Sequence, residues 1–284
     1  MGQKKGRFFC VAKWASFSLV LMSFGVGCRA GAQTPPVSAG TPYILHQSYP
    51  QNAEEGRPEQ LFFDELVRSL FKNAKLPFIE QLQQPWKRAY QETLYGPRHV
   101  VYPTTRTADR ENELEWAGPI SRTVWNLYGM KHAGWAGRQL ADIFASARIG
   151  VAMGSAREDY LRSRGAKNIV AVQRDDQLLA MLLADRIDVL AMGASSLGFL
   201  TSDAEARAVG RLASYRVCYL YVALSKDSPP GDVAKLQASL DRFYLDGHFL
   251  AMRRDFKLNA DPHSDFIQSL LHPASHNIGC VDMN

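Results

Sequence analysis

The chain has 284 residues, 46% of them apolar and 21% charged, so it is too apolar for a disordered chain and long enough for one large domain or two ordinary ones. Its formal net charge of +5 originates in residues 1–32, which hold five Lys and Arg and no acid. Without these five, 28 basic residues face 28 acidic ones. The chain from Gln33 onward is therefore formally neutral, and we expect neither a nucleic acid nor an anionic membrane as its partner.

Residues 1–32 have the pattern of a secretory signal: a basic start, an apolar run over Trp14–Val26 and small residues at Ala30–Ala32. The apolar run is shorter than the roughly 20 residues of a spanning helix. We therefore predict a periplasmic protein that begins at Gln33. A retained N-terminal anchor and lipid attachment at Cys28 are the alternatives. No later stretch is apolar enough to span a membrane, so the mature chain is expected not to cross one.

The mature chain keeps two cysteines, Cys218 and Cys280. An oxidising compartment allows a disulfide between them, and two separate thiols are the alternative. The sequence alone does not show whether the two residues come within bonding distance.

Strand and helix patterns alternate after a leader at Gln33–Gly40, which is predicted to be flexible. The predicted strands and helices, in chain order, are strand Tyr43–Leu45, helix 58–74, helix Pro85–Tyr95, strand Val100–Tyr102, strand Ile149–Ala152, a helix from Ser155 to about Arg164, strand Asn168–Val172, helix Asp175–Asp185, strand Ile187–Met192, strand Arg216–Leu224, and helices Asp232–Leu245 and His248–Phe256. Such alternation predicts parallel α/β units, followed by an irregular tail from Asn259.

Motifs for enzymes and cofactors are weak. The chain has no glycine-rich nucleotide loop of either common kind. Ser195 lacks the second glycine of a nucleophile elbow, so a helix cap is the better interpretation. Three histidines near the tail, His263, His272 and His276, do not have the spacing of a metal site on one helix face. We therefore expect no cofactor and no metal.

One ordered set of motifs is more specific. It consists of Pro85-Trp86-x-Arg88, Thr104-Thr105-x-x-Asp109-Arg110, Leu114–Pro119, Ile149-Gly150-Val151-x-x-Gly154-Ser155, Asp185–Asp188 and Tyr219–Lys226. In this order and spacing the chain resembles the extracellular solute-binding proteins of family 3, the periplasmic receptors of polar amino-acid ABC importers. The resemblance covers about residues 41–257.

The resemblance implies a type 2 periplasmic binding protein fold, in which two α/β lobes of mixed sheets flanked by helices hold a ligand in the cleft between them. Lobe one would comprise residues 41–121 and 222–284, and lobe two residues 122–221. The lobes would close over a bound ligand.

The resemblance also implies which residues bind the ligand. Arg110 corresponds to the arginine that holds a ligand carboxylate, a task that suits the two parallel donors of a guanidinium. Thr105 would add a hydroxyl and Pro103 its carbonyl oxygen. Ser155 and Ala156 begin the lobe-two helix, whose N-terminus favours an anion.

Each of these residues also has an ordinary structural interpretation. Arg110 would pair on the surface with Asp109 or Glu113, Thr105 would cap a turn, and Ser155 would be a helix cap. Trp86 corresponds to an aromatic residue that packs on the ligand and would otherwise belong to the core.

The expected partners of a ligand ammonium are missing. The segment after strand Ile187–Leu190 is Ala191-Met192-Gly193, and the first loop has His46–Tyr49, neither with an acid. Because an unpaired buried charge is costly, we predict a ligand without an α-amino group, or an amine held by Tyr49 and Trp86. Glu54 or Glu55 would be another source of the missing charge.

We therefore expect a monomeric, non-enzymatic receptor that captures a small polar, carboxylate-bearing molecule and presents it to an ABC permease or a membrane sensor. The alternative is an enzyme on the same scaffold, since periplasmic dehydratases resemble this family. Such an enzyme would need a general acid or base, and His46 and Glu54 are the candidates.

Overall fold

The computed structural model describes residues 40–47, 58–81, 84–194, 202–258 and 279–283. The signal segment, Tyr49, Glu54, Glu55, Ser195 and the three tail histidines lie outside these ranges. No helix within them is both long and apolar enough to cross a membrane.

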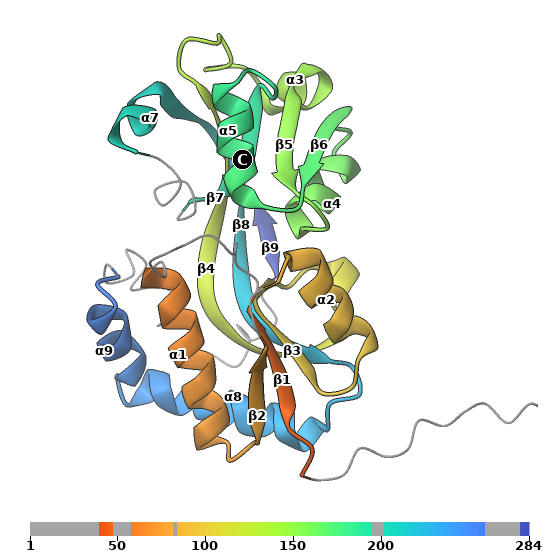
Figure 1. Cartoon of the computed structure of the whole chain (residues 1–284), viewed down its shortest axis with the longest axis vertical. Coiled ribbons are helices and arrows are strands. Elements are labelled where there is room, and N and C mark those ends of the chain that lie inside the picture. Colours follow the sequence, from red (N-terminus) through yellow and green to blue (C-terminus); the bar gives the residue numbers. More distant parts are fainter. Residues whose placement is uncertain (1–39, 48–57, 82–83, 195–201, 259–278, 284) are drawn as a thin grey trace, which may run out of the picture. The chain divides into compact units, whose positions relative to one another are not determined.

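The described strands form one mixed sheet (Figure 1). They are β1 Tyr43–Gln47, β2 Phe78–Gln81, β3 His99–Thr105, β4 Leu114–Met130, β5 Arg148–Ala152, β6 Asn168–Val172, β7 Val189–Gly193, β8 Val209–Ser225 and β9 Cys280–Asp282. Their order is β2-β1-β3-β8-β4-β7-β5-β6, and β9 pairs with β8. The pairs toward both ends of this order are parallel, whereas β3–β8, β8–β4 and β4–β7 are antiparallel.

The helices begin and end where the local sequence favours it. They are α1 Pro58–Asn73, α2 Trp86–Tyr95, the 3₁₀ turn η1 Ala108–Arg110, α3 Leu140–Ser146, α4 Ala156–Ser163, α5 Asp175–Leu183, α7 Asp203–Ala208, α8 Pro230–Leu245 and α9 His248–Asp255. Pro58 and Pro230 occupy first positions, where the missing N–H costs nothing. Ser202 and Glu205 form a capping box at the start of α7.

Helices cover the two faces of β3 and its neighbours. Val100 and Tyr102 point toward the first core, to which α1, α8 and α9 contribute, and Val101 points toward α2 on the other face. Successive strand residues face opposite sides, so this alternation places α2 opposite the first core. Figure 1 shows α1 grouped with α8 and α9.

A second core lies around β5 and β7. Ile149, Val151 and Val189 pack there with residues of α3 and α4, while Leu190 and Met192 face α5. Successive residues of β7 therefore point to opposite faces of the sheet, and both faces are buried because helices cover each of them.

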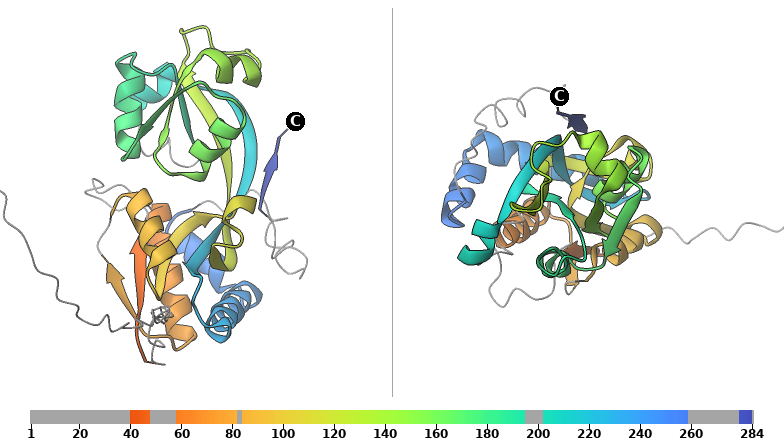
Figure 2. Two further views of the ribbon diagram at one scale, coloured as in Figure 1. Left: turned by 90° about the vertical axis from the view of Figure 1, so that its right-hand side faces the viewer. Right: turned by 90° about the horizontal axis from the view of Figure 1, so that it is seen from above.

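Two long strands, β4 and β8, contribute to both cores and pair with each other along most of their length (Figure 2). Their register shifts between Ala117 and Ser121. Gly118 lies at this shift with φ +150°, and an added Cβ would come within 2.6 Å of the Tyr221 ring. A side chain at position 118 would therefore push the two strands apart.

The sequence predicted most elements of the two α/β units, including β6 with its observed ends. It missed β4, which contains Gly118 and Pro119, two residue types that are uncommon inside strands. It also missed β2, a four-residue edge strand with Ile79 exposed. Of the predicted strands, β1, β5 and β6 have only parallel neighbours, and β3 and β7 each have one parallel and one antiparallel neighbour. The parallel prediction is wrong for β8, which runs antiparallel to all of its neighbours.

The C-terminal strand β9 is attached to β8 by a disulfide between Cys218 and Cys280. Cys280 packs against the second core, although the sequence assigned the whole tail to lobe one. Asp282 lies 3.0 Å from Arg216 and 3.8 Å from Arg164. The Sγ of Cys280 lies 3.9 Å from the carbonyl oxygen of Arg106, so Cys280 reaches the segment that follows β3.

Candidate functional site

Arg110 connects the segment after β3 with the start of α4. It ends η1, five residues after Thr105, and only 5% of its surface is exposed. Its Nη2 donates to the carbonyl oxygen of Gly154 and to Oδ2 of Asp159, each at 3.1 Å. Its Nη1 is buried and has no hydrogen-bond partner among the described residues. An unpaired donor of this kind is costly unless something else accepts its hydrogen bond.

Two aromatic residues one turn apart on α2 support the guanidinium. The rings of Trp86 and Tyr90 stack with centroids 5.5 Å apart, and the guanidinium of Arg110 lies 4.5 Å from the Tyr90 centroid and 5.8 Å from that of Trp86. The indole of Trp86 also donates to the Gly154 carbonyl at 2.9 Å. Trp86 is partly buried and lies beside the Arg110 guanidinium. Its role in packing against a ligand stays a prediction.

Gly154 adopts a conformation that favours glycine. Its φ is +70°, and an added Cβ would lie 3.2 Å from the Lys87 side chain. This turn aims the Gly154 carbonyl at Trp86 and Arg110. Its N–H donates to Oε2 of Glu158 at 2.7 Å, which fixes the turn to α4.

Ser155 is the N-cap of α4, as its structural alternative predicted. Its hydroxyl accepts from the Glu158 N–H at 3.2 Å. Ala156, the first helical residue, is buried beside it. A role for either residue in holding an anion stays a prediction.

Thr105 and Pro103 lie on β3 on the way to Arg110. Thr105 is buried at the end of the strand, paired with Leu220 of β8, and Pro103 is partly buried. Their proposed contacts with a ligand stay predictions. Tyr49 lies outside the described residues.

An ion pair between Arg106 and Glu111, which no sequence motif marks, holds the segment that carries Arg110. The Arg106 guanidinium donates to both oxygens of Glu111, at 2.7 and 2.5 Å, and lies 5.1 Å from the Tyr221 centroid. The Arg106 side chain holds the pKa of Glu111 below its usual range. A basic and an acidic residue five apart on a loop give no recognisable sequence signal, because the loop shape decides whether they meet.

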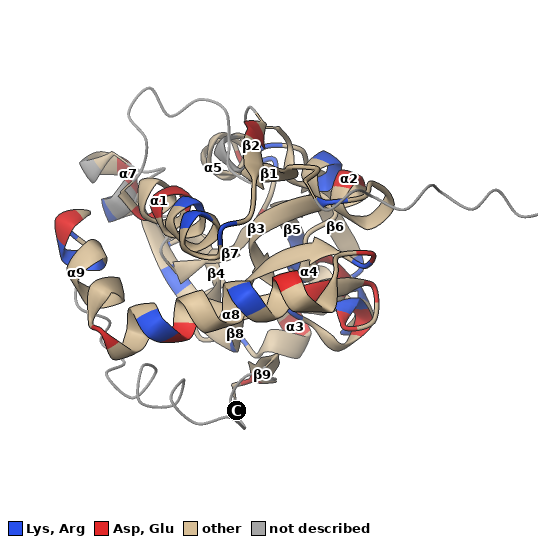
Figure 3. Cartoon of the chain, turned by 90° about the horizontal axis from the view of Figure 1, so that it is seen from below, with Lys and Arg blue, Asp and Glu red and all other residues tan. Residues whose placement is uncertain are grey.

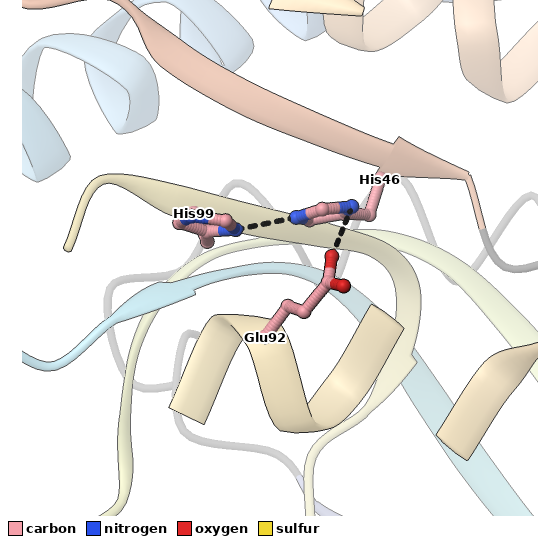
Figure 4. Close-up of side chains that lie close together, drawn as sticks. All are labelled: His46, Glu92 and His99. Carbon is pink, nitrogen blue, oxygen red and sulfur yellow. Dashed lines mark hydrogen bonds and ion pairs between the residues drawn. The ribbon is translucent and has the colours of Figure 1, made fainter. Parts of the chain in front are cut away.

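His46 is fully buried and belongs to a separate cluster with Glu92 of α2 and His99 of β3 (Figure 4). Its Nε2 lies 2.6 Å from Nδ1 of His99, and its Nδ1 lies 2.8 Å from the Gln84 amide nitrogen. The same amide donates to Oε2 of Glu92 at 3.0 Å. A neutral His46 with its proton on Nε2 satisfies both of its contacts.

The same cluster has the composition of a metal site. The ligand atoms of His46, Glu92 and His99 lie within 4.8 Å of one another. However, the two nitrogens of His46 face different partners, His99 on one side and Glu92 on the other (Figure 4). In these rotamers Nε2 of His46 lies 2.6 Å from Nδ1 of His99, so the arrangement fits a hydrogen-bond chain better than a metal centre.

This cluster gives a prediction about stability and pH. Burial, and then His99, lower the pKa of His46 from 6.5 to about 4. Between these values the unfolded chain binds a proton on His46 that the folded chain does not. The contribution of His46 is therefore expected to lower the free energy of unfolding by up to about 3 kcal/mol as the pH drops from 7 to 4. Urea unfolding of His46→Gln should show a flatter pH dependence than wild type, with the exposed His132→Gln as control. Parallel curves for His46→Gln and wild type would contradict this.

Comparisons with known proteins show the fold. Neither a protein-family model nor a curated protein sequence matches the chain. Solved structures do match. A histidine kinase sensor domain with similarity to periplasmic binding proteins has a TM-score of 0.66 at 13% identity, with 76% of this chain and 95% of that one covered.

Two further matches are similar in extent. The glutamate-bound ligand-binding core of GluR0 from Nostoc punctiforme has a TM-score of 0.64 at 14% identity, covering 77% of this chain and all of that one. An ancestral amino-acid-binding protein, a precursor of cyclohexadienyl dehydratase, has a TM-score of 0.61 at 13% identity, covering 75% and 94%. The chain therefore has the two-lobed fold of periplasmic binding proteins, with a mixed α/β sheet and flanking helices.

Proposed function

We propose that the chain is an exported receptor that binds a small carboxylate-bearing solute between its two lobes. The observation that carries this proposal is Arg110. Its buried guanidinium contacts Gly154 and Asp159, and its Nη1 has no hydrogen-bond partner in the described part of the chain. A ligand carboxylate would supply two parallel acceptors to such a group.

In this proposal lobe one comprises residues 41–121 and 222–284, except that β9 (Cys280–Asp282) pairs with β8 residues of lobe two, and lobe two comprises residues 122–221. Arg110, Trp86 and Tyr90 then lie on lobe one, and Gly154 and Asp159 on lobe two. A solute held by both sides would favour the closed arrangement because it contacts both lobes at once. Thr105, Pro103, Ser155 and Ala156 would complete the site around the carboxylate.

The partner would be a membrane protein that recognises the closed form. Some structural neighbours are amino-acid-binding proteins of transporters and another is the sensor domain of a histidine kinase, so both an ABC permease and a membrane sensor fit the proposal. Export through the signal at residues 1–32 would bring the receptor to the periplasm. On the face in Figure 3, acidic and basic residues alternate along α1, α8 and α9, which favours neither nucleic acid nor an anionic surface.

An enzyme on this scaffold has weaker support. One structural neighbour is a dehydratase precursor, although it is itself an amino-acid-binding protein. His46 is fully buried, and both of its ring nitrogens already face protein groups. It is therefore poorly placed to exchange a proton with a solute.

A thermal-shift screen of the purified chain from Gln33 onward tests the receptor function. The panel would contain amino acids, amines and organic acids. A solute that binds only the folded form at 100 times its Kd should stabilise it by about 2.7 kcal/mol, which is a clear rise in Tm. Stabilisation by amines alone, or by none of the compounds, would contradict a carboxylate receptor.

A further inference from the structure

Arg110 already has an anionic partner in the described structure. Oδ2 of Asp159 lies 3.1 Å from its Nη2, and 56% of the Asp159 side chain is exposed. An exposed carboxylate exchanges its hydrogen bonds with water readily and is therefore held weakly. Asp159 thus takes one of the donors that an incoming carboxylate would need for a bidentate contact.

The charges of this pair restrict what can replace it. Arg110 and Asp159 together are neutral. A simple carboxylate that displaces Asp159 brings a second negative charge next to the Asp159 carboxylate and gives the site a net negative charge, and Glu113, whose Oε2 accepts from Tyr90 at 3.1 Å, adds another nearby. A solute that also carries a positive group leaves the site neutral, because the displaced carboxylate can pair with that group.

Asp159 could also provide the acidic partner for a ligand ammonium that the sequence lacks at the expected position. The segment expected to hold an acid for a ligand ammonium contains Ala191 and Met192, and both are buried on β7. Asp159 lies on α4, one turn beyond the Gly154–Ser155 turn, and its carboxylate is within hydrogen-bond distance of the guanidinium that would hold the solute's carboxylate.

We propose that Asp159 is a specificity-determining residue that changes partner when a solute binds. It pairs with Arg110 before binding and with a cationic group of the solute afterwards. This inference rests on the proposed function of Arg110. It selects solutes with a positive group close to the carboxylate over simple carboxylates, in contrast to the ligand without an amino group that the sequence suggested.

The test compares matched solutes on wild type and Asp159→Asn. Thermal shift and calorimetry would use each of the 20 standard amino acids together with the same compound lacking its α-amino group, such as L-glutamate with glutarate. Asp185→Asn is the control, since Asp185 is also exposed and also lies 3.1 Å from an arginine Nη2, that of Arg148. Circular dichroism checks that each variant is folded.

In wild type we expect at least one amino acid to bind more tightly than its partner compound. Asp159→Asn should change that affinity ratio by about 10- to 100-fold in favour of the simple carboxylate, as loss of a charged hydrogen bond implies. Asp185→Asn should leave it unchanged. An equal gain for both compounds would show mere competition by Asp159 and overturn the proposal, as would an unchanged ratio or no binding of any pair. The receptor function fails separately, if the wider screen finds no carboxylate or if Arg110→Ala does not affect binding.

Discussion

Replacement of Arg110 by alanine is expected to abolish binding of whichever carboxylate the screen identifies. Removing one partner of a desolvated charge pair costs roughly 2–5 kcal/mol, which weakens micromolar binding to millimolar or beyond. Titration calorimetry measures this directly. The guanidinium lies almost entirely out of solvent beside Tyr90, so little water is present to replace its contact with the solute.

Two further variants separate charge from geometry. Arg110→Lys keeps the positive charge but loses the planar pair of donors, so we expect an intermediate loss of affinity. Arg254→Ala removes an exposed arginine from α9 and should bind as wild type does. Unchanged affinity in a folded Arg110→Ala protein would refute the placement of the site.

The second large effect concerns the disulfide. The cross-link between Cys218 and Cys280 closes a loop with a sequence separation of 62 residues. On the chain-entropy account, losing a cross-link of this span lowers the free energy of unfolding by about 4 kcal/mol. The ion pairs of Asp282 cannot compensate, because this residue is half exposed and such pairs contribute at most about 1 kcal/mol each.

Urea unfolding of the Cys218→Ala/Cys280→Ala double variant tests this value. Reduced wild type is the matched control, since it loses the cross-link and keeps both side chains. Both should unfold at a lower urea concentration than the oxidised protein. A loss of less than 1 kcal/mol in both would show that the cross-link does not stabilise the folded chain.

The sequence predicted well the features that depend on local pattern. The alternation of apolar runs and amphipathic helices gave the two α/β units, and the motif order placed Trp86, Arg110 and the Gly154–Ser155 turn in positions that the structure does bring together. Tyr49, Glu54 and Glu55 lie outside the described residues, so that part of the predicted site stays a prediction.

Contacts between residues that are far apart in the sequence could not be predicted from local pattern. Asp159 looks like an ordinary acid in the first turns of a helix, and only the fold brings it to Arg110, 49 residues away. His46 and His99 are 53 residues apart and meet because β1 and β3 are parallel neighbours. Strand β4 was missed because it contains Gly118 and Pro119, and the structure places them where its pairing with β8 shifts register.

A crystal structure of the chain with the first carboxylate that the screen identifies tests the central claim most directly. We expect the solute between the two lobes, with its carboxylate oxygens about 3 Å from the Arg110 guanidinium nitrogens and Asp159 no longer bonded to Arg110. A solute bound elsewhere, with the contact between Arg110 and Asp159 intact, would contradict the account.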